Sequence, residues 1–172
     1  MPERHDEEGM ARFAALVDRW AARELGANPL LEAVERDPAE ARWLVRLAGE
    51  DKEHITVWLH LRERTLHHEC HVIPAPEEGH QAVYEHLLRA NARIYGMAFA
   101  VGNEDAVYLR GQVPLSWLDE DELDRIVGSC WQWTEQHFRA LLRLGFPSPA
   151  EEHGEEMREI ITHPVDALEA AG

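Results

Sequence analysis

The chain has 172 residues, 45% of them hydrophobic, which is enough for one domain with an ordinary core and terminal extensions. Its 33 acidic residues outnumber the 17 basic ones, so the formal net charge is −16. The electrostatic field of such a chain repels phosphates. It is therefore not expected to bind nucleic acid or anionic membranes through a basic surface.

Several features of the sequence predict a cytoplasmic protein. The two cysteines, Cys70 and Cys130, are too few for a disulfide framework, and buried free thiols are expected. The first residues, Met1-Pro-Glu-Arg-His-Asp-Glu-Glu, are polar and acidic, unlike the apolar core of a signal peptide. No segment of the sequence approaches the roughly 18 apolar residues of a membrane span, so no membrane contact is expected.

The first part of the chain predicts two helices. Asp6 can cap a helix over residues 7–25, whose apolar residues recur every three or four positions. Asn28 and Pro29 are typical of an N-cap and a first helical position, so a second, short helix is expected to reach Arg36.

Three strands are expected next, over residues 42–47, 52–61 and 66–73. The middle segment alternates apolar and polar residues, which is typical of a strand with one buried face. Pro74 ends the third strand, because proline lacks the N–H that strand pairing needs.

The second half of the chain predicts two helices, a hairpin and a tail. These are a helix over residues 79–95, strands over 97–101 and 106–113, a helix over 119–144 and an acidic tail over 150–172. The order of helix, three strands, helix, two strands and helix favours an α+β fold. We expect an antiparallel sheet of about five strands with helices packed on it.

Several short phrases occur in an order that resembles one bacterial family. They are Trp43-Leu-Val-Arg-Leu, Ile55-Thr-Val-Trp-Leu, Ala82-Val-Tyr-Glu-His-Leu-Leu-Arg-Ala-Asn91, Tyr108-Leu-Arg-Gly-Gln-Val-Pro-Leu115, Asp121-Glu-Leu-Asp-Arg-Ile-Val-Gly128 and Leu144-Gly-Phe146. Together they resemble the YbjN-domain family of bacterial sensory transduction regulators, which implies a type III secretion chaperone-like fold. The resemblance divides the chain into an N-terminal helical segment (1–40), a YbjN-like domain (41–149) and the acidic tail (150–172).

Histidines gather in the expected hairpin centred on Glu63-Arg64. Its opposite pairs would be Leu61 with Leu66, His60 with His67, Trp58 with Glu69, and Thr56 with His71. His60, His67, Glu69 and His71 would then share one sheet face, and their side chains suit zinc or nickel. Their spacing matches no known metal motif, however, and a partly exposed face that tolerates histidines explains them as well. We assign no metal.

Two further polar residues are expected to be structural. Cys70 has histidine neighbours, as a Cys/His nucleophile would, but the strand pattern places it on the core face, where thiols are inert. Asn91 lies one turn after Leu87, near the centre of the helix's apolar stripe. A buried amide needs partners, most simply backbone groups of a neighbouring strand or loop.

Tryptophans mark the candidate partner contacts. Trp131 and Trp133 widen the apolar arc of the last helix beyond what a one-sided core contact needs. They either wrap the core or meet a partner, since exposed aromatic surface is frequent at interfaces. Trp58, on the polar side of its strand, is the third candidate.

The sequence thus favours a non-catalytic protein-binding module, chaperone-like or regulatory, without a cofactor. No phosphate loop, nucleophile elbow or kinase signature indicates an enzyme. The resemblance to the family implies a homodimer. The alternative is a regulator that responds to a metal or small ligand through the histidine-rich sheet face.

Overall fold

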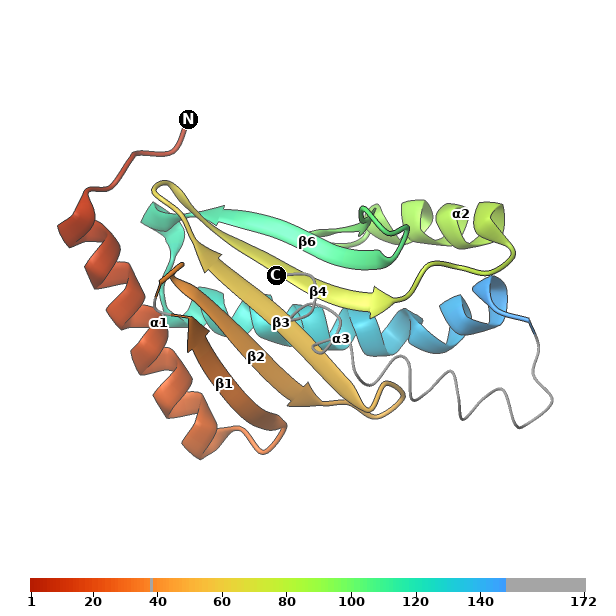
Figure 1. Cartoon of the computed structure of the whole chain (residues 1–172), viewed down its shortest axis with the longest axis horizontal. Coiled ribbons are helices and arrows are strands. Elements are labelled where there is room, and N and C mark those ends of the chain that lie inside the picture. The colour runs from red at the N-terminus through yellow and green to blue at the C-terminus, as the bar shows by residue number, and fades with distance from the viewer. Residues whose placement is uncertain (38, 148–172) are drawn as a thin grey trace.

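A six-stranded antiparallel sheet forms the centre of the structure, a computed structural model that describes residues 1–37 and 39–147 (Figure 1). In chain order the elements are α1 (Glu7–Ala27), β1 (Leu31–Asp37), β2 (Arg42–Ala48), β3 (His54–Leu61), β4 (Thr65–Ile73), α2 (His80–Asn91), β5 (Ala98–Val101), β6 (Val107–Pro114), the 3₁₀ turn η1 (Leu115–Trp117) and α3 (Glu120–Gly145). Across the sheet the strands follow the order β1-β2-β3-β4-β6-β5. The predicted α+β class is confirmed.

The segment after α1 is a strand, so the predicted short helix up to Arg36 is wrong. β1 pairs with β2, with Val34 opposite Val45 and Arg36 opposite Trp43. Leucine, glutamate, alanine and arginine dominate this segment and favour a helix in isolation. Hydrogen bonding along the free edge of β2 overrides that preference. The sheet therefore has six strands rather than five, and residues 1–40 are not purely helical.

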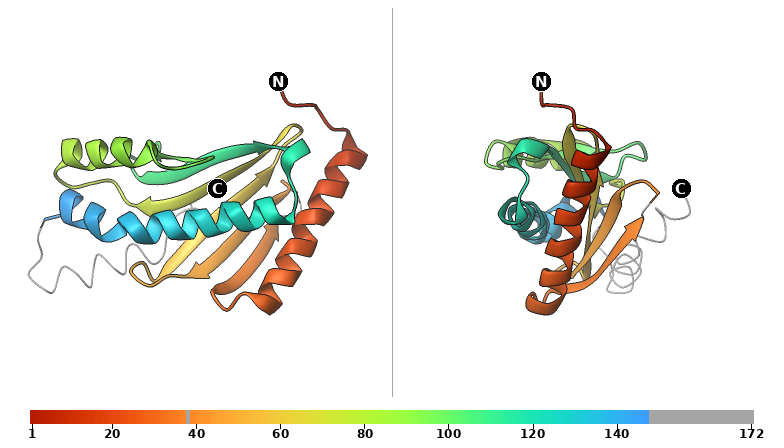
Figure 2. Two further views of the ribbon diagram at one scale, coloured as in Figure 1. Left: turned by 180° about the vertical axis from the view of Figure 1, so that it is seen from behind. Right: turned by 90° about the vertical axis from the view of Figure 1, so that its left-hand side faces the viewer.

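The three helices lie on one side of the sheet, as Figure 2 shows from behind. α3 crosses the middle of that side, α1 lies at the β1 end, and α2 lies beside α3 at the β5 end. The covered face is apolar, because alternate residues of the strands point toward the helices. Its fully buried members include Val45, Ile55, Val57, Leu59, Leu66, Cys70, Val72, Val107 and Leu109.

The helix caps follow the sequence. The Asp6 carboxylate accepts a hydrogen bond from the Gly9 N–H at the start of α1, and the Asp119 carboxylate accepts one from the Glu122 N–H at the start of α3. Each cap satisfies a backbone donor that has no partner inside its helix. α2 ends at Asn91, four residues earlier than predicted.

Two tryptophans fasten α1 to the rest of the domain. Trp20, on α1, donates its indole N–H to Asp124 of α3 at 2.8 Å. Trp43, on β2, donates its own to Asp18 of α1 at 2.9 Å. Both rings are almost fully buried. The N-terminal helix is therefore part of the domain's packing.

The turn between β2 and β3 is fixed to α3. The Glu135 carboxylate accepts hydrogen bonds from the backbone N–H groups of Asp51 and Lys52, at 2.7 and 3.3 Å. Trp131, one turn earlier on α3, donates its indole N–H to the Ala48 carbonyl at 2.8 Å. A Cβ on Gly49 would lie 1.8 Å from the Lys52 carbonyl oxygen, so the turn closes only around glycine.

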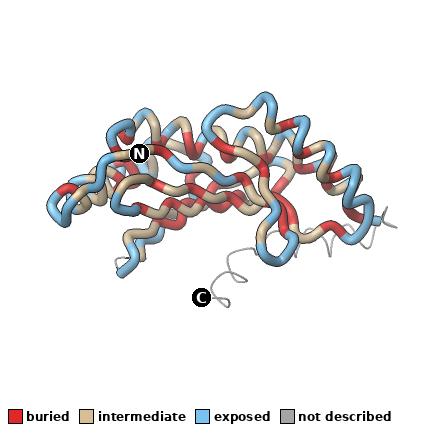
Figure 3. Tube along the Cα trace, turned by 90° about the horizontal axis from the view of Figure 1, so that it is seen from above, coloured by how far each residue is buried: buried red, intermediate tan, exposed pale blue. Residues whose placement is uncertain are grey.

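The opposite face of the sheet carries no helix among the described residues (Figures 1 and 2). Viewed from above, buried and partly buried residues alternate along the strands (Figure 3). None of the described helices is long and apolar enough to cross a membrane. The predicted acidic tail over residues 150–172 lies outside the described residues.

Candidate functional site

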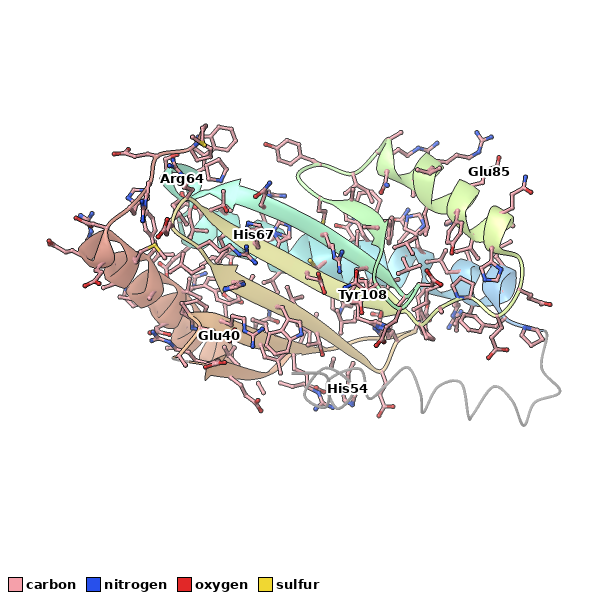
Figure 4. The ribbon with its side chains drawn as sticks, turned by 45° about the horizontal axis from the view of Figure 1, so that its top comes forward. Glu40, His54, Arg64, His67, Glu85 and Tyr108 are labelled. Carbon is pink, nitrogen blue, oxygen red and sulfur yellow. The ribbon has the colours of Figure 1, made fainter. Side chains whose placement is uncertain are left out.

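The uncovered sheet face contains a hollow with a volume of about 690 Å³. Four arginines, four carboxylates and the histidines His60 and His67 are among the groups that line it around two larger apolar side chains, Leu44 and Trp58. In Figure 4, His67 lies in the upper part of the sheet and Glu40 near the β1–β2 edge. Positive and negative groups balance here, although the whole chain has a formal charge of −16. The hollow therefore differs electrostatically from the rest of the molecule.

The predicted register between β3 and β4 is confirmed and places His60 in this hollow. Leu61 lies opposite Leu66, His60 opposite His67, and Trp58 opposite Glu69. The paired residues end at Val57 and Cys70, one position before the predicted pairing of Thr56 with His71. The turn of the hairpin thus brings two imidazoles and an indole onto one surface.

Arginines hold the walls of the hollow. The Arg110 guanidinium contacts the Glu69 carboxylate at 2.6 Å across the β4–β6 pair. Arg42 contacts Glu40 at 3.1 Å and also places its guanidinium 5.4 Å from the centre of the Trp58 ring. A guanidinium over an indole face is attractive because the ring face is electron-rich.

The histidine pair lies in a locally positive field. Burial lowers the pKa of His60, and the guanidinium groups of Arg62 and Arg42 lower it further. Burial likewise lowers the pKa of His67, with additional repulsion from Arg62 and His60. Neighbouring cations lower a histidine pKa because they disfavour a second positive charge. Both imidazoles are therefore mainly neutral at pH 7.

His71 takes part in a separate arrangement with Lys52. The Lys52 ammonium is buried, and it donates a hydrogen bond to the His71 carbonyl oxygen at 2.6 Å. Burial lowers the pKa of Lys52 to about 8, and burial with the charge of Lys52 lowers that of His71 to about 3. Within residues 1–37 and 39–147, no three His, Cys, Asp or Glu side chains are arranged to hold a metal ion.

His68 lies on the covered face, in a position that sequence reasoning missed. It is opposite Gly111 and only 2% exposed. Within the described part of the chain, neither ring nitrogen has a hydrogen-bond partner. A Cβ at Gly111 would lie 2.4 Å from His68 Nε2, so the glycine leaves room for the ring. Burial, and then the charges of Arg125 and His67, lower the pKa of His68 to about 4.

Cys70 packs inside the core, on the face predicted for it. Its thiol is fully buried and lies 3.6 Å from the Thr134 hydroxyl of α3. A hydrogen bond from Cys130 lowers the pKa of Cys70, while burial acts in the opposite direction. Both cysteines are free thiols, as the sequence predicts.

The structure separates the three tryptophans proposed as partner contacts. Trp58 lies in the hollow, and its indole N–H is buried without a partner among the described residues. Trp131 gives its N–H to Ala48, and the Trp133 ring stacks on His137 with centroids 5.9 Å apart. Trp117, which the sequence did not single out, is 67% exposed on η1. Among these tryptophans Trp58 alone lines the hollow and has a buried indole N–H without a described partner.

Asn91 joins α2 to β5 through both atoms of its amide. Its Nδ2 donates to the Phe99 carbonyl oxygen at 3.1 Å, and its Oδ1 accepts from the Phe99 N–H at 2.7 Å. The partners are backbone groups of a neighbouring strand, which is the kind of partner a buried amide needs.

With this geometry in place, comparison with known proteins identifies the family. The family model named YbjN, described as "Putative bacterial sensory transduction regulator", matches residues 29–143. The chain belongs to the YbjN family. The match runs from the start of β1 into α3 and so includes every strand of the sheet.

Relatives of this YbjN-family protein occur in mycobacteria. Uncharacterized proteins of Mycobacterium bovis and Mycobacterium tuberculosis are each 41% identical to it over 105 residues, which is 61% of this chain. An uncharacterized protein of Mycobacterium leprae is 36% identical over 107 residues, or 62% of this chain. The matched region spans only 57–58% of the length of these relatives.

Solved structures share the fold of the YbjN protein at low sequence identity. A chain of the HopA1–SchA chaperone–effector complex superposes with a TM-score of 0.56 at 12% identity, covering 79% of this chain and 99% of the other. A chain of the heterodimeric ExoU–SpcU complex from the type III secretion system of Pseudomonas aeruginosa gives 0.51 at 18% identity, covering 77% and 99%. The predicted type III secretion chaperone-like fold is confirmed.

Proposed function

We propose that this YbjN-family protein is a non-catalytic protein-binding module, chaperone-like or regulatory, that acts in the cytoplasm as a homodimer. The hollow on the uncovered sheet face is the surface on which a protein partner docks. Trp58 is the observation that carries this proposal. It is a large aromatic side chain in an open hollow, with an indole N–H that lacks an acceptor in the described residues.

The surroundings of Trp58 support docking of a protein segment. Aromatic and arginine side chains are the ones most enriched at interaction hot spots, and the hollow supplies both. Its pairs of guanidinium and carboxylate groups would orient a polypeptide, while Leu44 and Trp58 offer apolar contact. The fold likeness to chains of chaperone–effector complexes is consistent with this role.

Capture of a partner by the full chain tests the proposal. We expect wild-type protein on a resin to retain a protein from an extract of the source bacterium, and Trp58→Ala to retain at least about tenfold less, because a truncated hot spot costs roughly 2 kcal/mol. The retained protein, once purified, is then titrated calorimetrically against both variants. Trp117→Ala is the matched control, since Trp117 is exposed on η1, outside the hollow.

Two outcomes would count against this surface. Equal retention by wild type and Trp58→Ala would remove the hollow as the docking site. Retention that is lost in the presence of a chelator, and also in a His60→Ala, His67→Ala double variant, would favour the metal-responsive alternative.

The end of the molecule formed by α2 and β5 is our proposed contact with a second copy. Three large apolar side chains are exposed there: Leu88 by 71%, Tyr95 by 73% and Val101 by 44%. Among the described residues β5 is an edge strand that pairs only with β6, and none of them pairs with its outer backbone groups, which another strand can use. Trp133, on the neighbouring α3, is proposed as part of the same contact region.

A charge placed on this region is expected to break the dimer. We expect wild-type protein to have twice the 19.7 kDa chain mass in light scattering, and Leu88→Glu to have the monomer mass, because burying an unpaired carboxylate is costly. Leu25→Glu, on the exposed side of α1, is the control and should remain dimeric. A monomeric wild type at 100 μM would contradict the dimer.

A further inference from the structure

The hollow around Trp58 has the chemistry of a site for a carboxylate-bearing segment. Arg62 lies on its wall, and the part of the chain that the structure describes shows no ion pair for this guanidinium. His60 and His67 lie directly opposite one another beside it. The carboxylates Glu40 and Glu69 are paired with Arg42 and Arg110, which leaves Arg62 as the cation that an anion would meet here, whereas most of this acidic molecule repels anions.

An unused donor points to a hydrogen-bond acceptor in the same place. The Trp58 indole N–H is buried, and no described residue accepts from it. A buried donor without a partner costs about 1–3 kcal/mol, so such groups are normally satisfied. The neighbouring Thr56 hydroxyl, on the same strand face, is also buried without a described partner. A carboxylate or carbonyl oxygen lying in the hollow would satisfy the Trp58 N–H, since Trp58 is the one of the two that lines it.

The chain itself carries a segment with the complementary composition. Residues 148–172 contain seven carboxylates and one arginine, a formal charge of −6. They also contain Met157, Ile160 and Ile161, which could contact the Leu44 and Trp58 side chains of the hollow. We call residues 148–172 the C-terminal segment. It carries both the carboxylates and the apolar side chains that would complement the charged and apolar groups of the hollow.

The C-terminal segment is long enough to reach the hollow. It follows α3, which crosses the covered side of the sheet and spans about 39 Å at 1.5 Å per residue (Figure 2). Twenty-five residues extend up to roughly 80 Å at about 3.3 Å per residue. The chain can therefore pass from the end of α3 around the sheet and still lay more than ten residues across the opposite face.

We propose that the C-terminal segment of this chain binds in the hollow of its own sheet face, with carboxylates at Arg62 and at the His60–His67 pair and an oxygen acceptor at the Trp58 indole N–H. The segment then occupies the surface assigned above to a protein partner. In this respect the inference rests on the proposed function: a partner must displace the segment, which sets a threshold for binding.

Neutralising the segment in the full chain tests the proposal without any partner. The test variant replaces all seven carboxylates of the segment by their amides: Glu151, Glu152, Glu155, Glu156, Glu159, Asp166 and Glu169. The control variant makes the same seven-charge change at exposed sites in the described part: Glu3, Glu8, Glu50, Glu77, Glu78, Glu104 and Asp105. NMR follows the imidazole titrations of His60 and His67 and the Trp58 indole N–H, assigned with His60→Gln, His67→Gln and Trp58→Phe.

We expect the test variant, and not the control, to change these signals. His60 and His67 should titrate at lower pH than in wild type, because nearby carboxylates favour the protonated imidazole. Solvent exchange of the Trp58 N–H should accelerate at least about tenfold, the factor expected for loss of one hydrogen bond of about 1.4 kcal/mol. A synthetic peptide of residues 148–172 added to the test variant should restore both signals, and 0.5 M NaCl should weaken the effect.

Other outcomes overturn the inference. Identical histidine titrations and indole exchange in wild type and test variant would show that the segment does not occupy the hollow. Signals that depend on protein concentration would assign the occupant to a second copy instead. The proposed function can fail independently, because these signals involve no partner. If both hold, the test variant should bind the captured partner more tightly than wild type does.

Discussion

Replacement of Gly49 by alanine is expected to lower the free energy of unfolding by about 3 kcal/mol, at the upper end of the cost of overpacking. The new Cβ would lie 1.8 Å from the Lys52 carbonyl oxygen and 2.5 Å from a Glu135 carboxylate oxygen. The turn would have to open, and the Glu135 hydrogen bonds to Asp51 and Lys52 would be lost with it. Urea titration followed by tryptophan fluorescence measures the change.

Gly128→Ala provides the matched control for this prediction. Gly128 is exposed on α3, and a Cβ built there has nothing within 4 Å. Alanine in a helix is favoured over glycine by roughly 0.5–1 kcal/mol, so this variant should be slightly more stable than wild type. Equal stability of Gly49→Ala and wild type would mean that the turn relaxes without cost, contrary to its attachment to α3.

Acid is expected to destabilise the fold between about pH 6.5 and pH 4 through two buried imidazoles, His68 and His71, and the contribution of His68 can be isolated. The folded state holds this imidazole neutral with its pKa lowered to about 4, because the ring is buried. The unfolded chain takes up the proton near pH 6.5, so in this interval it binds more protons than the folded state, and stability falls as the pH falls. Over the 2.5-unit interval the loss is on the order of 3 kcal/mol. Below pH 4 the folded state is protonated too, and the contribution of His68 stops growing.

His68→Leu should remove this part of the pH dependence. At pH 7 the variant should be about as stable as wild type or more so, because it replaces a buried ring without described hydrogen-bond partners by an apolar side chain. Urea midpoints at pH 7, 6, 5 and 4 give the slope, with the exposed His80→Leu as control. If the urea midpoint of His68→Leu fell with pH as steeply as that of wild type, groups other than His68 would cause the acid sensitivity. His71 is the next group to test.

Local patterns predicted most of the fold, and the main error shows where they fail. Alternation identified β3, and proline positions identified the ends of β4 and β6, because these signals act within one strand. β1 was misread as a helix because its residues have helical propensity and its pairing partner, β2, lies later in the chain. Pairing between segments has no local signal, so the sixth strand could be found only from the structure.

The candidate site was predictable in part for the same reason. A hairpin centred on Glu63-Arg64 places His60 opposite His67, and this register was predicted from the sequence. The role of Trp131 did not, because its acceptor, the Ala48 carbonyl, belongs to a turn 83 residues away in the chain. Alternation along β4 already places His68 on the core face with Cys70, but the space for its ring depends on the missing side chain of Gly111 on β6, which the sequence does not reveal.

The burial of Lys52 has a consequence for chemical modification of this protein. It is the only lysine in the chain and is 1% exposed, so every other residue that carries a permanent positive side-chain charge is an arginine. Acetylation removes charge from lysine ammonium groups and leaves guanidinium groups unaffected. The folded surface of this chain therefore offers lysine-acetylating enzymes and amine-directed cross-linkers no side-chain target.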